Sequence, residues 1–347
     1  MKGIIIAGGQ GTRLRPLTYH RPKPLVPVVN RPFLEYQVAL LKHHGIDDIV
    51  FATNFLAEQI QNHFGDGSRF GVRMRYAVED SPLGTGGAIR NAADLFPGES
   101  VAVFNGDVLT DYDLGAVLAF HAEKNAIATI TLQPVPSPNP FGVLKLDADD
   151  RVKAWVEPSE ETKKALANLE HVPVTGTDLI NAGFYVFDAA FIATIPQGER
   201  SSVERDIFPK LLAEEAPIYG ISPGGFWMDL GRAEQLMAAT RAILDGSVKT
   251  YTTDTAVASI DTISQGVLIG GLTTIGRNVS IGHGTVINDC IIMDSVTIGS
   301  RAVLSHLIVD ERTTIGDEVI LEGKLGGATP VIAAGSAIMQ GSRMPNS

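Results

Sequence analysis

The sequence predicts an α/β protein in which a mostly parallel sheet is followed by a parallel β-helix. Over about the first 230 residues, short β-branched runs alternate with longer segments that carry apolar residues at helical spacing, a pattern typical of βαβ units. After a linker at 246–253 the charge thins out, and short Ile/Val runs recur beside glycine. This change of texture predicts a second domain with an internal repeat.

The first region contains the strands and helices of the predicted sheet. Strands are predicted at 3–7, 48–52, 73–77, 101–104, 128–133 and 184–187. Helices are predicted at 35–43, 56–64, 86–95, 114–124 and 232–244. Sheets of this kind bind ligands at the carboxyl ends of their parallel strands, so side chains and turns that follow these strands are the first candidates for a site.

The second region repeats with a fixed period. Ile-Gly occurs at 281, 298 and 315, and 298 − 281 = 315 − 298 = 17. Each unit divides into pieces of roughly six residues that begin with an aliphatic residue, as expected if each piece forms one flat side of a triangular coil. The first of these residues are Ile269, Ile275, Ile281 and Ile287.

Such a coil raises the question of acyl transfer, for which His283 would be the base. A histidine on the solvent face of a coil is the simpler interpretation, because the repeat is short and carries no substrate features of its own. We therefore expect a structural or subunit-contact role for the repeat, and a homo-oligomer.

Composition narrows the function classes. A chain of 347 residues with 44% hydrophobic and 19% charged residues can bury a sizeable core. Its formal charge of −11 argues against a nucleic-acid surface, so any phosphate site must be a local concentration of Arg and Lys. Cys290 is the single cysteine and cannot form an internal disulfide. With no apolar run of about 18 residues and a strand at the start, we expect no membrane span, no secretory signal and a cytoplasmic protein.

The turn after the first strand has the features of a phosphate cradle. Gly8-Gly9-Gln10-Gly11-Thr12-Arg13 offers backbone N–H groups beside a cation. The dinucleotide fingerprint fails because position 14 is Leu, and the Gly-Lys-Ser/Thr of ATP-type loops is absent, so a tight connection with a solvated Arg stays open for the turn alone. Pro22 and Pro24 bracket Lys23, which predicts a stiff extended segment that holds the ammonium facing the turn.

These residues carry a resemblance to a known family. The stretch from Gly8 through Pro16-Leu17-Thr18 to Pro22-Lys23-Pro24-Leu25 resembles the signature of the sugar-1-phosphate nucleotidyltransferases. Further motifs follow in the family's order: Leu83-Gly84-Thr85-Gly86-Gly87, Asn105-Gly106-Asp107, Phe141-Gly142-Val143, Asn181-Ala182-Gly183 and Trp227-Met228-Asp229-Leu230-Gly231. Ser202-Val203-Glu204-Arg205-Asp206-Ile207-Phe208-Pro209 most resembles the mannose-1-phosphate guanylyltransferase branch. The resemblance implies a Rossmann-like catalytic domain at 1–245 and a left-handed, hexapeptide-repeat β-helix at 254–343.

The resemblance also implies a reaction. A phosphate oxygen of the sugar 1-phosphate attacks the α-phosphorus of a nucleoside triphosphate in line, giving an NDP-sugar and pyrophosphate. Because this nucleophile is already an anion at neutral pH, no general base is needed, and positioning and charge neutralisation must carry the catalysis. The sequence agrees, since its eight histidines form no cluster.

The family pattern assigns roles to individual residues. It implies catalytic roles for Arg13, Lys23 and Asp107, and Mg²⁺ binding by Asp107 and Asp229, whose hard oxygen ligands suit that ion. The implied nucleotide-binding residues are Gly8, Gly9, Gly11, Thr12, Glu79, Gly84 and Thr85. The implied sugar-phosphate-binding residues are Gly142, Glu157, Asn181 and Arg205.

Glu79 bears on the choice of nucleotide. A carboxylate only accepts hydrogen bonds, and guanine presents two adjacent donors, N1–H and the N2 amine, which favours GTP. An exposed Glu at a strand end is the alternative, and some uridylyl-transferring relatives also carry an acid here.

The sequence departs from the family at one basic position. The family reads Glu-Lys-Pro where this chain reads Glu157-Pro158-Ser159, so the lysine that meets the sugar phosphate is missing. Arg205, Lys163 or Lys164 are the candidates to replace it. A catalytically weak regulatory subunit that binds NDP-sugar and contacts an active partner is therefore the main alternative, and a uridylyl- or thymidylyltransferase is the next.

Overall fold

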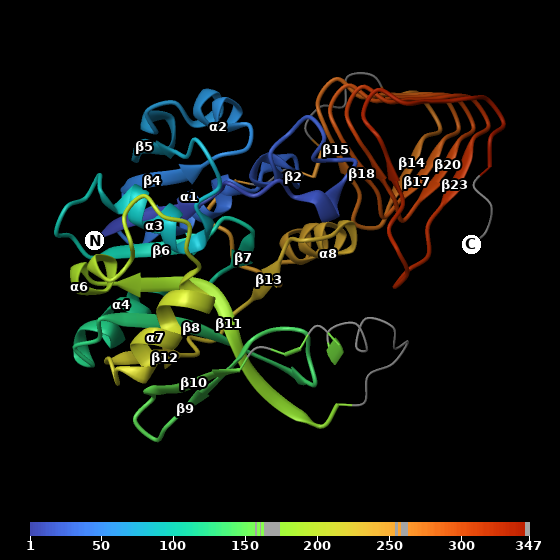
Figure 1. The fold of residues 1–347 in the computed structure, drawn as a ribbon. Helices are drawn as coiled ribbons and strands as arrows, with labels where there is room; N and C mark the ends of the chain where they lie inside the picture. The colour runs from blue at the N-terminus through green and yellow to red at the C-terminus, as the bar shows by residue number, and fades with distance from the viewer. Residues whose placement is uncertain (157, 160, 163–173, 254–255, 258–262, 344–347) are drawn as a thin grey trace. The chain divides into compact units, whose positions relative to one another are not determined.

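The structure is a computed structural model that describes residues 1–156, 158–159, 161–162, 174–253, 256–257 and 263–343 (Figure 1). Its contacts divide the chain into two compact units. The first, the sheet unit, comprises Met1–Gly8 and Leu40–Trp227. The second, the coil unit, comprises Gly9–Ala39 and Met228–Ser347. Helix α1 (Leu34–His43) runs from the coil unit into the sheet unit. None of the helices in the described ranges is long and apolar enough to cross a membrane.

The sheet unit is built on one mixed sheet, which has nine strands among the described residues. The main path has the order β10-β9-β11-β6-β1-β4-β5, and β8 pairs with β11 and β12. Its strands are β1 (Lys2–Ile6), β4 (Asp48–Thr53), β5 (Arg73–Val78), β6 (Val101–Asn105), β8 (Ala128–Ser137), β9 (Val143–Leu146), β10 (Val152–Val156), β11 (Gly176–Phe187) and β12 (Ile218–Ile221).

The predicted parallel sheet is confirmed at its centre. β1 pairs in parallel with β4 and β6, and β4 pairs in parallel with β5. β11 differs, because it runs antiparallel to β6, β8 and β9. Five of the six predicted strands lie within observed ones, and the one predicted at 3–7 runs one residue past the end of β1. β8 extends to Ser137 in spite of Pro134 and Pro136. β12 pairs with β8 only as far as Thr131, so these prolines lie where the outer edge of β8 has no strand partner among the described residues, and a missing N–H costs no ladder bond there.

Helices pack on this sheet and close its apolar core. They are α2 (Ala57–Phe64), α3 (Gly84–Ala93), α4 (Leu114–Glu123), α6 (Ala189–Ala193) and α7 (Phe208–Ala213), with short turns η3 (Ser68–Phe70) and η4 (Val203–Ile207). Strand β7 (Val108–Thr110) follows β6, and β13 (Trp227–Asp229) spans the junction between the units. The core combines buried aliphatic residues of the central strands with Tyr185, Phe187, Phe191 and Phe208. These rings hold η4 and α7 against the sheet.

The predicted parallel β-helix is confirmed in the coil unit (Figure 1). Three parallel sheets stack with a 17-residue register, for example Ile281 on Ile298 and Ile298 on Ile315. The strands are β14 (Leu268–Gly270), β15 (Thr274–Ile275), β16 (Ser280–Ile281), β17 (Val286–Asn288), β18 (Ile291–Ile292), β19 (Thr297–Ile298), β20 (Val303–Ser305), β21 (Ile308–Val309), β22 (Thr314–Ile315), β23 (Ile320–Glu322), β24 (Val331–Ile332) and β25 (Ala337–Ile338).

The interior of the coil follows the repeat, with two exceptions. Ile275, Ile281 and Ile287 are buried as predicted, whereas Ile269 is 40% exposed. Ile275 and Ile281 are also bridged to Val257 and Ile263 of the preceding chain segment, and no such bridge to β14 occurs among the described residues. Between β23 and β24 the register lengthens from 17 to 23 residues, since Ile308 pairs with Val331. His283 is exposed, and its Nδ1 lies 2.6 Å from the carbonyl oxygen of Gln265 on the previous coil.

The rest of the coil unit is the segment that follows the first glycines. It forms the turns η1 (Thr12–Leu14) and η2 (Lys23–Leu25) and the small hairpin β2 (Pro27–Val28) and β3 (Arg31–Pro32). Helix α8 (Ala233–Leu244) contacts β2. This segment carries the predicted phosphate cradle and Lys23.

Candidate active site

Gly11 and Lys23 pack directly against each other within the coil unit. Gly11 has a φ of +58°, and a Cβ built on it would lie 2.8 Å from Lys23 Cβ and 3.1 Å from Thr18 Cγ2. The Thr18 hydroxyl donates a 2.8 Å hydrogen bond to the Gly11 carbonyl. Only glycine satisfies both the backbone angle and the close approach. The glycine turn at Gly11 and the Lys23 side chain therefore pack as one structural element. Gly9 and Thr12 are close to Gly11 in the sequence and belong to the same turn.

The lysine segment differs from its predicted extended form. Pro22 is extended, with φ −67° and ψ 144°, but Lys23–Leu25 forms a single 3₁₀ turn closed by hydrogen bonds from Leu25 N to Pro22 O and from Val26 N to Lys23 O. Pro24 lies in the first turn, where its missing N–H leaves no bond unmade. The prolines thus stiffen the segment as expected, but they do so by fixing a turn.

Arg13 and Asp229 lie beside Gly231, and Lys23 lies on the other oxygen of the Asp229 carboxylate. Lys23 Nζ lies 3.9 Å from Asp229 Oδ1, and these side chains are 11% and 20% exposed. A Cβ on Gly231 would lie 2.9 Å from Asp229 Oδ2 and 3.0 Å from Arg13 Nη2. The Gly231 N–H is bound by Gln235 Oε1 at 2.8 Å. Asp229 therefore lies between the two cations, and a side chain at position 231 would clash with Asp229 and Arg13.

Asp107 follows β6 in the sheet unit and is half-buried. Gly106 immediately before it has its N–H bonded to the Ile6 carbonyl at 2.9 Å, and a Cβ there would lie 2.4 Å from that oxygen. Gly8, two residues after β1, is less crowded, with 3.3 Å from a built Cβ to Asn54 Cβ. The glycines thus allow the turns after β1 and β6 to approach their neighbours closely.

Glu79 directly follows β5 and is 9% exposed, so it is a buried carboxylate rather than a solvated strand end. Its Oε2 accepts a 2.9 Å hydrogen bond from the Leu83 N–H, and its carbonyl accepts one from Asn54 Nδ2. Burial raises the pKa of the Glu79 carboxyl above its ordinary value, and the Leu83 N–H partly opposes this shift. A carboxylate has about four acceptor positions, so acceptor capacity is left for a ligand.

The glycines of the Leu83–Gly87 motif allow close packing against the backbone at 199–201. Gly84, with φ +74°, would place a Cβ 2.5 Å from Ser201 O, and Gly86 would place one 2.6 Å from Ser201 Oγ. Reciprocal bonds from Ser201 N to Leu83 O and from Gly86 N to Ser201 O, each 2.9 Å, join the two segments. The start of α3 is thereby held beside the segment that contains Arg205.

These two segments line a pocket of about 530 Å³, which brings together two predicted nucleotide-binding residues and one predicted sugar-phosphate-binding residue. The lining residues are Gly84, Thr85, Arg200, Ser201, Ser202, Glu204, Arg205 and Asp206. Arg205 is exposed in η4, with its N–H bonded to Ser202 Oγ at 3.2 Å. The pocket is strongly polar and carries two arginines.

Glu204 was not predicted as a site residue, although it precedes Arg205. Its Oε2 accepts hydrogen bonds of 2.7 Å from both Thr85 Oγ1 and Ser202 Oγ, and its Oε1 accepts one of 3.3 Å from Tyr185 OH. Tyr185 OH in turn accepts a 2.5 Å bond from Asn181 Nδ2. Burial holds the pKa of the Tyr185 hydroxyl well above its ordinary range, with a contribution from the Glu204 charge. A continuous chain of polar contacts therefore connects Thr85 to Asn181.

The Asn181-Ala182-Gly183 motif is a bulge in β11. The register with β8 shifts between Asn181 and Tyr185, and Gly183 has φ +77°. Asn181 Oδ1 accepts from the Gly183 N–H at 3.0 Å, and the Ala182 carbonyl accepts from Trp227 Nε1 at 2.7 Å. The bulge thus turns backbone groups away from the ladder and toward neighbouring motifs.

The remaining predicted sugar-phosphate-binding residues add little to the geometry of the site. Gly142 directly precedes β9. Glu157, Lys163 and Lys164 lie outside the described residues.

Comparison with known proteins identifies the family. The model of the family described as "Nucleotidyl transferase" matches residues 2–246, and that of the "GMPPB C-terminal domain" matches residues 252–346. The chain therefore belongs to the nucleotidyl transferase family, and it is a sugar-1-phosphate nucleotidyltransferase.

Two relatives show the range of activities among similar chains. The mannose-1-phosphate guanylyltransferase of Mycobacterium tuberculosis is 36% identical over 299 residues, covering 84% of this chain and 80% of the relative. The UTP–glucose-1-phosphate uridylyltransferase of Synechocystis is 32% identical over 320 residues, with 84% and 80% covered. Among solved structures, HddC from Yersinia pseudotuberculosis matches with a TM-score of 0.59 at 26% identity, covering 70% of this chain and 99% of HddC. HddC has also been solved in complex with GMP-PN, and that structure matches with a TM-score of 0.58.

Proposed function

We propose that this chain transfers GMP from GTP to mannose 1-phosphate and releases pyrophosphate. The observation that carries the choice of guanine is the buried Glu79 carboxylate at the carboxyl end of β5. An acceptor-only group at this place complements the N1–H and N2 donors of guanine. The M. tuberculosis relative and the HddC complex with GMP-PN support the same choice.

Charge neutralisation supplies the catalysis in this proposal. Arg13 and Lys23 neutralise the triphosphate, and Lys23 gains its strongest contact as negative charge moves to the departing pyrophosphate. The surroundings of Asp229 support this role, because Lys23 lies 3.9 Å from its Oδ1 and Gly231 lets Arg13 approach beside its Oδ2. The sugar phosphate meets Arg205, which stands in for the lysine that is absent after Glu157.

Asp107 and Asp229 would hold Mg²⁺. Both supply hard carboxylate oxygens, which suit an ion that takes few protein ligands and completes its shell with phosphate and water. When bound, the ion would neutralise phosphate charge and polarise the attacked phosphorus.

A scan of substrates tests the proposal. Pyrophosphate release is measured for GTP, UTP, dTTP and ATP, each with mannose, glucose and heptose 1-phosphates, in the presence of Mg²⁺. GTP with mannose 1-phosphate should give the highest kcat/KM. A different best pair would replace the assignment while leaving the reaction class intact.

The absent lysine after Glu157 favours a second candidate, a regulatory subunit that binds NDP-sugar without turnover. In that case no pair would release pyrophosphate, while GDP-mannose would bind in calorimetry. Turnover of any pair at several per second would exclude this candidate.

A further inference from the structure

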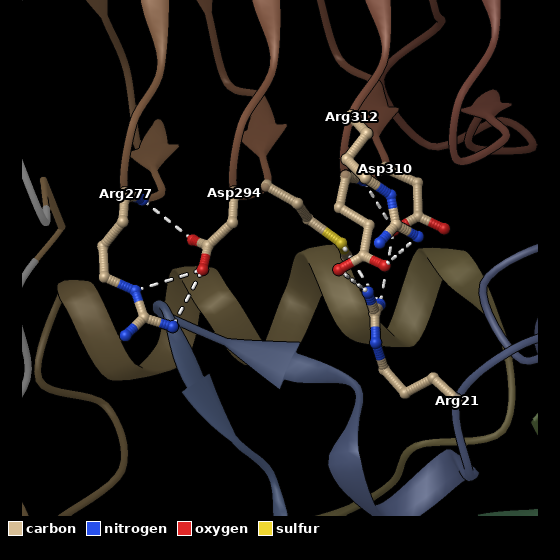
Figure 2. A network of polar contacts seen from close by, with 7 residues as sticks. Arg21, Arg277, Asp294, Asp310 and Arg312 are labelled. Atoms are coloured by element: carbon tan, nitrogen blue, oxygen red, sulfur yellow. Dashed lines mark hydrogen bonds and ion pairs between the residues drawn. The ribbon is translucent and has the colours of Figure 1, made fainter.

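Arg21 joins the lysine segment to the β-helix inside the coil unit (Figure 2). Its Nη1 lies 3.3 Å from Asp310 Oδ1 and 3.5 Å from Met293 Sδ, and its Nη2 lies 2.9 Å from Glu311 Oε2. The Arg21 side chain is 15% exposed and that of Asp310 only 3%. The contact therefore involves a guanidinium that is largely removed from water.

Asp310 is exceptional for its position in the repeat. The same turn position, which directly follows a strand, is occupied by Gly276, Met293 and Ala333 in other coils. Burial raises the pKa of the Asp310 carboxyl, and Arg21 opposes that shift. A carboxylate in this place costs free energy unless a cation meets it, so Arg21 and Asp310 depend on each other.

A short, stiff connection links Arg21 to Lys23. Pro22 fixes the intervening φ at −67°, and its carbonyl accepts from Leu25 N to close the 3₁₀ turn that begins at Lys23. The same segment is attached to the β-helix a second time, where Asn30 Nδ2 donates to the carbonyls of Ile275 and Ala256 at 2.9 and 3.0 Å. A shift of Arg21 must therefore be transmitted to Lys23.

We propose that Arg21 is a positioning residue for the reaction: by binding Asp310 and Glu311 it makes the β-helix the support that holds Lys23 in place. The inference rests on the role proposed above for Lys23. It assigns the β-helix a part in catalysis that requires no substrate contact of its own. A misplacement of about 1 Å at a reacting centre can cost about a hundredfold in rate, so the effect is measurable.

Four variants of the full chain test this with the best substrate pair: Arg21→Met, Lys23→Ala, the two combined, and Arg277→Met as the matched control. Arg277 pairs with Asp294 on the neighbouring coil at 2.9 Å, but its side chain is 74% exposed, and the dashed contacts drawn from it in Figure 2 go to Asp294. Arg21→Met should lower kcat about ten- to a hundredfold with KM for both substrates within about twofold. The combined variant should be no slower than Lys23→Ala, and Arg277→Met should match the wild type.

The outcomes separate the inference from the proposed function. If Lys23→Ala keeps kcat within a few-fold of wild type, the proposed role of Lys23 fails, and the inference fails with it. If Lys23→Ala is slow but the two losses multiply in the combined variant, or Arg21→Met is as fast as wild type, only the inference is overturned.

Two further measurements separate positioning from stability and do not depend on a single variant. Arg21→Met/Asp310→Asn removes the charge that Arg21→Met would leave unpaired, so its Tm should return toward wild type while kcat stays low; recovery of kcat together with Tm overturns the inference. Hydrogen exchange of peptides covering 11–25 should be faster in Arg21→Met than in wild type and unchanged in Arg277→Met. Unchanged exchange in Arg21→Met would also overturn it.

Discussion

The hydroxyl of Thr85 donates a 2.7 Å hydrogen bond to Glu204 Oε2, and this contact joins the start of α3 to the turn that carries Arg205. Through Tyr185 the same carboxylate reaches Asn181 in the β11 bulge. Residues that the family pattern divides between nucleotide and sugar are thus parts of one polar network in the sheet unit. A substitution among the residues assigned to the nucleotide should therefore also affect binding of the sugar phosphate, and the reverse.

Substitution of either member of this contact tests the coupling. Glu204→Gln keeps the shape of the side chain but replaces one carboxylate oxygen by an amide N–H₂. This N–H₂ group faces at least one of the hydroxyl donors of Thr85, Ser202 and Tyr185. That hydroxyl loses its acceptor, at a cost of about 1–3 kcal/mol. We expect kcat/KM to fall about ten- to a hundredfold for both substrates, at 1.36 kcal/mol per tenfold. Thr85→Val removes the other partner, and a double variant no worse than Glu204→Gln would show that the two act together. Additive losses would show that the contact couples nothing.

Asp107→Ala should abolish activity at any Mg²⁺ concentration. The loss of one metal ligand leaves phosphate charge poorly neutralised where the barrier is almost wholly electrostatic, so kcat should fall more than about a hundredfold. The measurement is pyrophosphate release against Mg²⁺ concentration, with EDTA-treated wild type as the reference for the metal-free rate. Turnover within a few-fold of wild type would remove Asp107 from the site.

Lys23→Ala should lower kcat much more than it raises KM for the triphosphate, because the ammonium binds most tightly as charge shifts toward pyrophosphate. The fold should survive, since the 3₁₀ turn is closed by backbone bonds from Leu25 and Val26. Steady-state kinetics and a thermal melt check both points. A rise in KM alone would make Lys23 a binder of the ground state.

The sequence predicts the parts of this molecule that local patterns encode. The 17-residue repeat specifies the stack because successive coils bury the same aliphatic positions. The exposed Ile269 and the insertion between Leu321 and Val331 depart from this pattern. The partnership of Gly11 with Lys23 is also predictable, since glycine allows a left-handed turn and close approach at Gly11 while the prolines fix the backbone on both sides of Lys23.

Long-range partnerships are not predictable in this way. No local pattern around Arg21 predicts a contact with Asp310, which is 289 positions away. In the sequence Asp310 is an ordinary turn residue, and only the structure shows that it is buried. The strand predicted at 184–187 is shorter than the observed β11, which begins at Gly176. The glycine and polar residues of the bulge at Asn181 interrupt the strand pattern in the sequence. Glu204 is not predictable as a site residue for a related reason: its partners Thr85 and Tyr185 lie far from it in the sequence.

Glu79→Gln tests whether the buried carboxylate selects guanine. An amide at this place offers one acceptor and one donor, which opposes one of the two guanine donors but suits the adjacent carbonyl and N3–H of uracil or thymine. We expect kcat/KM for GTP to fall about ten- to a hundredfold, at 1.36 kcal/mol per tenfold, while UTP or dTTP use holds steady or improves. The measurement is kcat/KM for all four nucleotides with both proteins.

The pKa of Glu79 supplies the control for this substitution. Because burial raises that pKa in the folded protein, the ionised carboxylate destabilises the fold, and this cost is present above the folded pKa and is relieved as the pH falls through it. Gln keeps an oxygen to accept from the Leu83 N–H, so Glu79→Gln should not lower Tm at pH 7 in the absence of ligand. If Glu79 serves to bind guanine, Glu79→Gln should show a lower preference for GTP while its Tm is not lower than that of the wild type. An unchanged ratio of GTP to UTP, or a large fall in Tm, would instead make Glu79 a support for the turn at Leu83, and the guanylyl assignment would lose its main physical argument.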